Sequence, residues 1–244
     1  MRIPRLYISQ QLKTNDTLTV SGKPAHHVTH VLRLRTGATL YVFDGKGHEY
    51  KAVLDAIGRN EINIKLVATV VSQAEPALNI CLVQGIARND RMDLILQKSV
   101  ELGISSIYPL WMQRSQSHLT GERLEKRIQH WQGTITSACE QCGRATLPAL
   151  FPPTCFPDWI TTHENEGIQI MLQPESTQTL AGLSAPEKSV TLLVGPEGGL
   201  NTEEQTLALA TGFTGIRLGQ RILRTETAAL TALVGIQTLW GDFR

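Results

Sequence analysis

The sequence predicts a chain in two parts: a small β-rich module over residues 1–72, followed by an α/β domain with a parallel sheet over residues 73–244. In the first part, short β-like stretches are separated by turn sequences, which is typical of strands joined as hairpins. From Leu78 onward, apolar strands alternate with helices, and this alternation indicates a parallel sheet. The boundary falls within residues 72–79, where Pro76 interrupts both patterns.

The β-rich module is expected to contain strands over residues 39–43, 49–57 and 61–72. The sequence Asp44-Gly45-Lys46-Gly47 between the first two is a hairpin turn by its composition. A short helix is expected over residues 24–32, because Val28, Val31 and Leu32 form an apolar stripe at the spacing i, i+3, i+4.

In the α/β domain, apolar periodicity and glycine stops delimit the elements. We expect strands over residues 78–86, 104–111, 167–173, 190–195 and 215–218, and helices over residues 90–102, 121–142, 202–211 and 225–240. The proline-rich stretch 147–157 is interpreted as a rigid connector. The last helix, TETAALTALVGIQTLW, is apolar on almost every side, so either a partner chain or the core of a single chain must cover it.

The composition, with 41% hydrophobic and 18% charged residues, is that of an ordinary globular protein. We expect a cytoplasmic protein, because there is no run of about 18 apolar residues and the first residues lack the features of a secretory signal. The four cysteines lack the spacing of a disulfide framework, which suits a reducing compartment. The pair Cys139 and Cys142 closes a long helix without a second pair at zinc spacing, so no metal is expected.

Charge is distributed unevenly along the chain. Residues 1–43 hold six basic residues and one acidic residue, whereas residues 145–187 hold five acidic residues and no lysine or arginine. Clustered Lys and Arg attract polyanions through counterion release, so the module is a candidate for binding nucleic acid, with a merely solvated face as the alternative. His26, His27 and His30 are interpreted as solvated or RNA-facing, because no carboxylate in sequence reach would order them as metal ligands.

Two glycine-bearing loops stand out in the second part. The turn GPEGG at residues 195–199 follows an apolar strand but lacks the P-loop and dinucleotide-binding patterns. Its Glu197 is unsuited to holding an anion, so a neutral or cationic ligand is expected there. In RLGQRILRTETAAL, residues 217–230, Arg221 and Arg224 bracket two apolar residues, Thr225 can cap the last helix, and Glu226 lies near its positive end.

The sequences GPEGG and LGQRILRTETA resemble the two signature loops of the SPOUT class of S-adenosylmethionine-dependent methyltransferases, and most of all those of the 16S rRNA (uracil-N3) methyltransferase (RsmE) family. The resemblance extends to HHVTHVLRLRTGATLYVFDGKGHEYKAVL, which is similar to the family's PUA-like RNA-binding β-barrel. It also covers DRMDLILQKSVELG and ACEQCGR. Residues 151–185 contain no motif that can be named and contribute nothing to the resemblance.

The resemblance implies an α/β domain tied in a trefoil knot, a bent S-adenosylmethionine in the knotted loops, and a homodimer in which the last helices pack together through the C-terminal domain. It implies cofactor-binding residues in three loops: Leu172, Gln173, Pro174, Val194, Gly195, Pro196, Gly198, Gly199, Leu218, Gly219, Leu223, Arg224, Thr225, Glu226 and Ala228. For contact with 16S rRNA of the small ribosomal subunit we nominate Arg2, Arg5, His30, Arg33, Arg35, Arg88, Lys98, Arg114 and Arg221.

The implied reaction places requirements on side chains. Uracil N3 is a poor nucleophile while it keeps its proton, so a proton acceptor and cations near the uracil oxygens are needed. The candidate cations are Arg144, Arg114, Arg221 and Arg224, of which we nominate Arg144 and Arg224 as catalytic, with Glu140 or Glu197 as the acceptor. The expected activity is methylation of one uridine of 16S rRNA to 3-methyluridine. The alternatives are another SPOUT enzyme, acting on a ribose 2′-hydroxyl or a different base, and a non-catalytic RNA-binding assembly protein.

Overall fold

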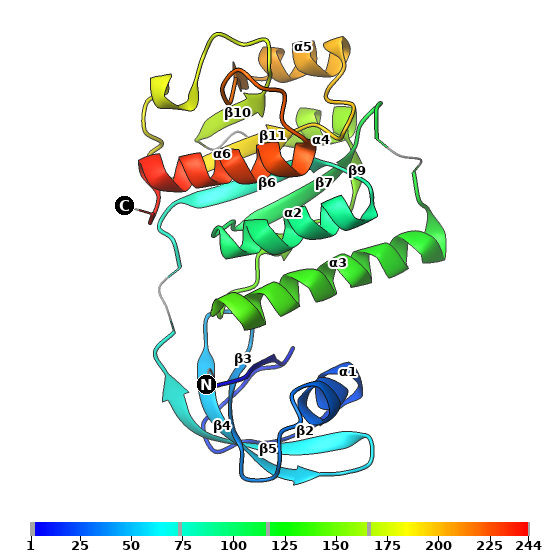
Figure 1. Ribbon diagram of the computed structural model, residues 1–244, viewed down its shortest axis with the longest axis vertical. Coiled ribbons are helices and arrows are strands. Elements are labelled where there is room, and N and C mark those ends of the chain that lie inside the picture. The colour runs from blue at the N-terminus through cyan, green and yellow to red at the C-terminus, as the bar shows by residue number, and fades with distance from the viewer. Residues whose placement is uncertain (1–2, 73–74, 116–117, 165–166, 244) are drawn as a thin grey trace. The chain divides into compact units, whose positions relative to one another are not determined.

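The computed structural model describes residues 3–72, 75–115, 118–164 and 167–243, which belong to two compact units (Figure 1). The first unit comprises Met1–Glu75 and Thr136–Leu147, and the second comprises Pro76–Ile135 and Pro148–Arg244. The sequence alone does not indicate that residues 136–147 join the first unit. They do so through side-chain hydrogen bonds, because the Arg5 guanidinium donates to the carbonyls of Cys139 and Arg144.

The first unit is built on a curled five-stranded sheet. Its strands follow the order β1-β3-β4-β5-β2, with β1 parallel to β3 and the other pairs antiparallel. The elements are β1 (Arg5–Tyr7), β2 (Thr17–Ser21), α1 (Gly22–His26), η1 (His27–Val31), β3 (Thr39–Phe43), β4 (Glu49–Ile57) and β5 (Glu61–Val70). The predicted hairpins of β3 with β4 and of β4 with β5 are confirmed, whereas β1 and β2 were not foreseen.

The predicted helix over residues 24–32 is irregular. After one turn of α-helix, η1 continues as a π-helix, in which the Leu32 N–H bonds to the His27 carbonyl at 2.9 Å. A π-turn holds more residues than an α-turn, so side chains beyond it rotate out of the α-helical register. Val28, near the start of η1, is buried as predicted. Val31, at its end, is 60% exposed and therefore does not belong to the apolar stripe.

The second unit is built on a parallel sheet, as the alternation of strands and helices predicted. Its strands follow the order β12-β10-β11-β6-β7-β8, and β9 pairs with β7. The elements are β6 (Asn79–Gly85), α2 (Asn89–Glu101), β7 (Ser106–Trp111), α3 (Gly121–Cys142), β8 (Ala149–Leu150), β9 (Thr154–Cys155), α4 (Phe156–Thr162), β10 (Ile168–Leu172), η2 (Leu180–Gly182), β11 (Ser189–Val194), α5 (Thr202–Ala210), β12 (Thr214–Ile216) and α6 (Thr225–Trp240). The last residues of α3, from Thr136 onward, belong to the first unit.

The stretch 147–157 is more than the rigid connector that its prolines suggested. It contributes β8 and β9, two short edge strands that pair with β7, and it ends at the start of α4. Pro157 lies in the first turn of α4, where a missing N–H costs nothing, and Phe156 is fully buried. Prolines thus delimit short elements here rather than exclude them.

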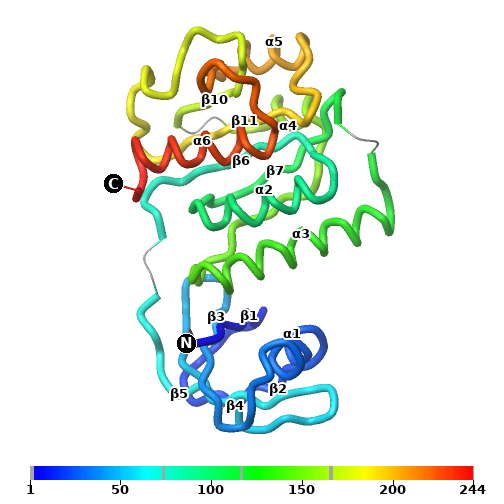
Figure 2. The backbone as a smooth tube through the Cα atoms, viewed as in Figure 1, coloured from blue at the N-terminus to red at the C-terminus, as the bar shows by residue number. Residues whose placement is uncertain are grey.

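Helices α2 and α6 pack side by side along the sheet, with α5 on the opposite side (Figures 1 and 2). One face of α6 is buried within the unit, through Ala229, Ala232, Leu233 and Ile236. Its Val234 is nevertheless 42% exposed, so the core of this chain covers only part of the apolar surface. No helix among the described residues is long and apolar enough to cross a membrane.

Candidate functional site

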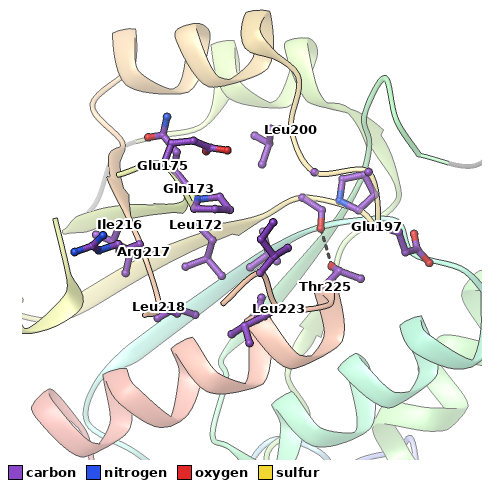
Figure 3. Close-up of a pocket in the computed structure, with 18 of the residues that line it drawn as sticks. Leu172, Gln173, Glu175, Glu197, Leu200, Ile216, Arg217, Leu218, Leu223 and Thr225 are labelled. Carbon is purple, nitrogen blue, oxygen red and sulfur yellow. Dashed lines mark hydrogen bonds between the residues drawn. The ribbon is translucent and has the colours of Figure 1, made fainter. Parts of the chain in front are cut away.

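A pocket of about 320 Å³ lies at the carboxyl edge of the parallel sheet, where ligands of open α/β sheets bind. Three loops form it: one after β10, one after β11 and one between β12 and α6. Leu172, Leu218 and Leu223 lie along one side of this loop pocket, and Glu197 lies at its end (Figure 3).

The structure brings most of the residues nominated for the cofactor to this one pocket. Those that line it are Leu172, Gln173, Pro174, Val194, Gly195, Pro196, Gly198, Gly199, Leu218, Gly219, Leu223, Thr225 and Ala228. Arg224 and Glu226 do not line it: Arg224 is the exposed N-cap residue of α6, and Glu226 lies in the first turn of that helix. The pocket also has lining residues not nominated for the cofactor, among them Arg114, Glu175, Gln205 and Arg217.

The turn GPEGG has room only for glycine at two places. A Cβ atom on Gly195 would lie 2.9 Å from the backbone of Gly199, and one on Gly198 would lie 2.9 Å from the Cβ of Arg114. Gly199 has a φ of 68°, a conformation that L side chains rarely adopt. The turn is closed by a hydrogen bond from the Gly199 N–H to the Pro196 carbonyl at 2.9 Å. Backbone therefore forms this wall of the pocket.

Gln84 and Thr225 connect two of the three loops. The Thr225 hydroxyl donates to the Gly195 carbonyl at 2.6 Å (Figure 3), and the Gln84 side-chain amide donates to the Thr225 hydroxyl at 3.0 Å. Gln84 is fully buried at the end of β6, directly opposite Val194 in the sheet register. The Gln84–Thr225–Gly195 link thus holds the GPEGG turn against the start of α6. Gln84 was not nominated from the sequence, although a polar side chain in an apolar strand was a signal.

Glu197 belongs to a charged cluster beside the pocket. Its Oε1 accepts from the Arg88 N–H at 2.9 Å and lies 3.5 Å from a guanidinium nitrogen of Arg91. Arg91 also lies 3.9 Å from Oε1 of Glu226, whose Oε2 is buried without a hydrogen-bond partner among the described residues. One cation therefore faces two carboxylates, which explains how a glycine-rich turn tolerates Glu197. Arg91 was not nominated from the sequence.

Two nominated catalytic residues, Glu140 and Arg144, lie in the first unit. Oε1 of Glu140 accepts from the Tyr7 N–H at 3.0 Å. Burial raises the pKa of the Glu140 carboxyl, and the Tyr7 N–H and nearby positive charge from His27 and Arg5 oppose that shift. Arg144 forms an ion pair with Glu75 at 2.6 Å. Unlike Glu197, neither residue lines the loop pocket.

Among the nominated RNA contacts that the structure describes, Arg5 alone is buried. It is 8% exposed, and its guanidinium donates to Glu49 at 2.7 Å and lies over the ring of Phe43. A guanidinium held this way is not free to meet a phosphate, which argues against Arg5 as an RNA contact. Arg2, which was also nominated, lies outside the described residues.

The remaining nominated RNA contacts fall into three places. His30, Arg33 and Arg35 are exposed on the first unit. Arg114 donates to the Gly198 carbonyl at 2.8 Å, and Arg221 lines the loop pocket as an exposed residue. Arg88 is exposed at the N-cap of α2, and Lys98 lies farther along that helix, where it pairs with Glu101 at 2.8 Å.

The cysteines have no metal-site geometry. All four are free thiols, and the described residues contain no group of three or more His, Cys, Asp or Glu side chains that could hold an ion. Burial raises the pKa of the Cys139 thiol to about 12 and that of the Cys81 thiol to about 11. Both therefore stay protonated, which makes them poor nucleophiles.

Comparison with known proteins gives consistent matches over the whole chain. Residues 74–237 match the family model described as "RNA methyltransferase domain", and residues 20–67 match "RNA methyltransferase PUA domain". The chain is 33% identical over 243 residues to "Ribosomal RNA small subunit methyltransferase E" of Buchnera aphidicola subsp. Acyrthosiphon pisum, with 100% of this chain and 96% of the relative covered.

Two solved structures are similar over their full length. One is a ribosomal RNA small subunit methyltransferase E from Neisseria gonorrhoeae bound to S-adenosyl methionine, with 35% identity, a TM-score of 0.93 and full coverage of both chains. The other is a methyltransferase from Legionella pneumophila in complex with the same cofactor, with 33% identity, a TM-score of 0.96 and full coverage of both chains.

Proposed function

Because the chain belongs to the ribosomal RNA small subunit methyltransferase E family, we propose that it methylates N3 of one uridine in 16S rRNA with S-adenosylmethionine as the methyl donor. The observation that carries the proposal is the meeting of three loops, distant in sequence, at one pocket on the carboxyl edge of the sheet. Similar chains whose structures contain S-adenosylmethionine support the choice of cofactor.

The pocket fits this cofactor by the chemistry of its walls. Leucine side chains and exposed turn backbone suit an adenosine, whose recognition requires an apolar slot and a few hydrogen bonds. Glu175 and Glu197 lie among the lining residues and favour a positive charge. When bound, the cofactor supplies an activated methyl group, so the protein must supply position and charge stabilisation.

The side chains must then accept the imide proton of uracil and stabilise the negative charge that its loss leaves on the base. Glu197 is the nominated acceptor that lines the pocket, and its Oε1 lies 3.5 Å from the Arg91 guanidinium, which holds the carboxylate at the end of the pocket. Arg114 and Arg221 line the same pocket and can stabilise negative charge on the uracil oxygens, with Arg224 next to them in the chain. Glu140 and Arg144, from the first unit, complete the nominated catalytic set.

Residues 1–72 are proposed to bind the rRNA. Residues 73–244 are proposed to bind the cofactor and carry out the methyl transfer. The match to an RNA methyltransferase PUA domain and the exposed His30, Arg33 and Arg35 support this division. A ribosomal RNA substrate supports a cytoplasmic location for the enzyme.

A homodimer through the C-terminal domain is part of the proposal. Exposed apolar side chains on the paired helices and the adjoining loop support it, since single-chain packing leaves them in water: Leu94, Ile222, Val234, Leu239 and Phe243. The family resemblance carries the further expectation that the loops of the pocket are tied in a trefoil knot. Sedimentation of the purified protein tests the dimer: a species near twice 26.9 kDa is expected, and a monomer at micromolar concentration would contradict it.

The function is tested by incubating the purified protein with S-adenosylmethionine and small ribosomal subunits from a strain that lacks the enzyme. Nucleoside mass spectrometry should then detect 3-methyluridine in 16S rRNA. A methylated ribose or a different methylated base would identify another SPOUT activity. Absence of any methylation, together with no rise in melting temperature on adding S-adenosylmethionine, would favour a non-catalytic RNA-binding protein.

A further inference from the structure

A second cavity, of about 650 Å³, lies within the first unit between the helical turn and the hairpin of β4 and β5. One wall is formed by α1 and η1, which contribute His26, Thr29 and His30. The facing wall is the turn that joins β4 to β5 and includes Arg59. In Figure 2, α1 lies beside β2 and β5. We call this cavity the histidine pocket.

The histidine pocket offers a flat aromatic surface. The rings of His26 and His30 are stacked, with their centroids 4.4 Å apart and an angle of 9° between their planes. Both side chains are exposed, so the stack is accessible from solvent. A nucleobase can extend such a stack, and stacking on aromatic side chains is the usual way in which unpaired RNA bases are held.

The hydrogen bonds of Thr29 assign the tautomer of His30. The Thr29 hydroxyl has one proton, and its oxygen lies 2.9 Å from the Ala25 carbonyl, which can only accept. The same oxygen lies 2.8 Å from Nδ1 of His30, so this ring nitrogen is assigned as the donor. A neutral imidazole that donates from Nδ1 carries its free lone pair on Nε2. His30 therefore presents an acceptor suited to a base N–H.

The facing wall adds groups of mixed charge. Arg59 provides a cation, Asn60 an amide and Glu61 a carboxylate. A free phosphate would meet repulsion from Glu61, whereas a base can donate to that carboxylate while its phosphate lies nearer Arg59. The combination of a flat surface, acceptors and one cation matches a nucleotide better than an isolated anion.

We propose that the histidine pocket holds one nucleotide of single-stranded RNA, with its base stacked on the His26–His30 pair, a base N–H donated to Nε2 of His30, and its phosphate beside Arg59. The proposal rests on the function proposed above, because it takes the RNA to be the substrate of the same enzyme. It adds a base-reading contact to a module whose clustered charges can only position a backbone.

The test measures binding of a fluorescently labelled single-stranded RNA decamer to the full-length protein by anisotropy. His30→Ala should weaken binding about tenfold, in line with the loss of one base stack. Arg59→Ala should lower the salt dependence by about one phosphate contact. His48→Ala and Lys51→Ala are matched controls, since both residues are exposed on the same unit outside the histidine pocket, and they should bind like the parent.

The tautomer assignment has a separate test. Thr29→Val removes the hydroxyl that orients His30 and should weaken binding about threefold, whereas Thr29→Ser keeps the hydroxyl and should bind like the parent. A decamer that carries 4-thiouridine should also crosslink, on irradiation, to peptides that contain His26, His30 or Arg59. This second measurement holds even if a variant fails to fold.

The outcomes separate this proposal from the function itself. If the parent methylates small-subunit RNA but His30→Ala and Arg59→Ala bind and crosslink the decamer as the parent does, the histidine pocket is not a nucleotide site and the enzymatic function stands. If the parent neither binds S-adenosylmethionine nor methylates RNA, the proposed function fails, whatever the decamer shows. Crosslinks confined to other surfaces would also overturn the nucleotide assignment.

Discussion

The loop pocket of the second unit and the buried charges of the first unit are built in opposite ways. The pocket is shaped by backbone: tight glycine turns, strand ends and a hydroxyl that ties two loops together. In the first unit, side chains dominate, because Arg5 and Glu49 form a buried ion pair 2.7 Å apart and Arg5 also fixes the carbonyls of residues 139 and 144. The loop pocket can receive a ligand, whereas the buried charged groups of the first unit are already paired with each other and with backbone carbonyls.

A charged residue in the sequence can serve either the fold or a binding site. In the first unit the most basic stretch of sequence includes an arginine that serves the fold, while His30 and Arg33 stay exposed. In the second unit a carboxylate in a glycine turn signals tolerance of a cation near the ligand. Charge indicates function only when exposure is known as well.

The largest effect is expected in the backbone-built region. In Gly198→Val the new side chain would collide with Arg114, whose guanidinium holds the Gly198 carbonyl. S-adenosylmethionine binding, measured by calorimetry, should fall below detection, while affinity for RNA stays close to that of the parent. Gly133→Val is the control, because a Cβ atom at Gly133 meets nothing within 4 Å. Retained cofactor affinity in Gly198→Val would show that this turn does not contact the ligand.

Arg5→Ala should have the next largest effect, now on stability. Removing one partner of a buried pair leaves the Glu49 carboxylate uncompensated, so the free energy of unfolding should fall by about 3–5 kcal/mol. Denaturant unfolding followed by a probe in the first unit measures this loss. Lys65→Ala, on the exposed side of β5, should change it by less than about 0.5 kcal/mol. A nearly neutral Arg5→Ala that instead lost RNA affinity would restore Arg5 as an RNA contact.

Thr225→Val tests whether the loop pocket depends on the tie between its loops. Valine keeps the shape of threonine but leaves the Gly195 carbonyl without its 2.6 Å donor, so we expect roughly tenfold weaker binding of S-adenosylmethionine. Thr225→Ser retains the hydroxyl and should restore most of the affinity. If valine and serine variants bind alike, the link made by Gln84 and Thr225 does not organise the site.

Glu140→Gln, in the first unit, should have the smallest effect on stability. Burial raises the pKa of Glu140, so the folded chain binds this proton more tightly than the unfolded chain. The stability contributed by the carboxyl is then present below its unfolded pKa and is lost as pH rises through the folded value. Glutamine avoids that loss and can still accept from the Tyr7 N–H.

At pH 7 the melting temperature of Glu140→Gln should therefore equal that of the parent or exceed it by up to about 4 °C, and the difference should shrink as pH falls. Glu125→Gln, at an exposed position of the same helix, is the control. A stable Glu140→Gln variant that loses methyl transfer but keeps cofactor affinity would identify Glu140 as the proton acceptor. If methyl transfer is undiminished in Glu140→Gln, Glu197 remains as the candidate proton acceptor.

Sequence patterns predicted much of the fold because local periodicity governed it. The strands and helices of the parallel sheet lie within a few residues of their predicted bounds, and α6 and α3 begin and end where predicted. The failures occurred where tertiary contacts override local signals: the π-turn at His27–Val31, the edge strands within residues 147–157, and the short β1 and β2.

By itself, the sequence determined the strand and helix alternation, the glycine turn at residues 195–199 and the capped start of α6, because each depends on the conformational preferences of a few neighbouring residues. Only the tertiary structure decided that Gln84 ties the loops, that Arg91 balances Glu197, and that Arg5 is interior. Those roles depend on contacts between residues that are far apart in the sequence, from 44 positions for Arg5 and Glu49 to 141 for Gln84 and Thr225. The sequence pattern around each of them is compatible with exposure as well as burial.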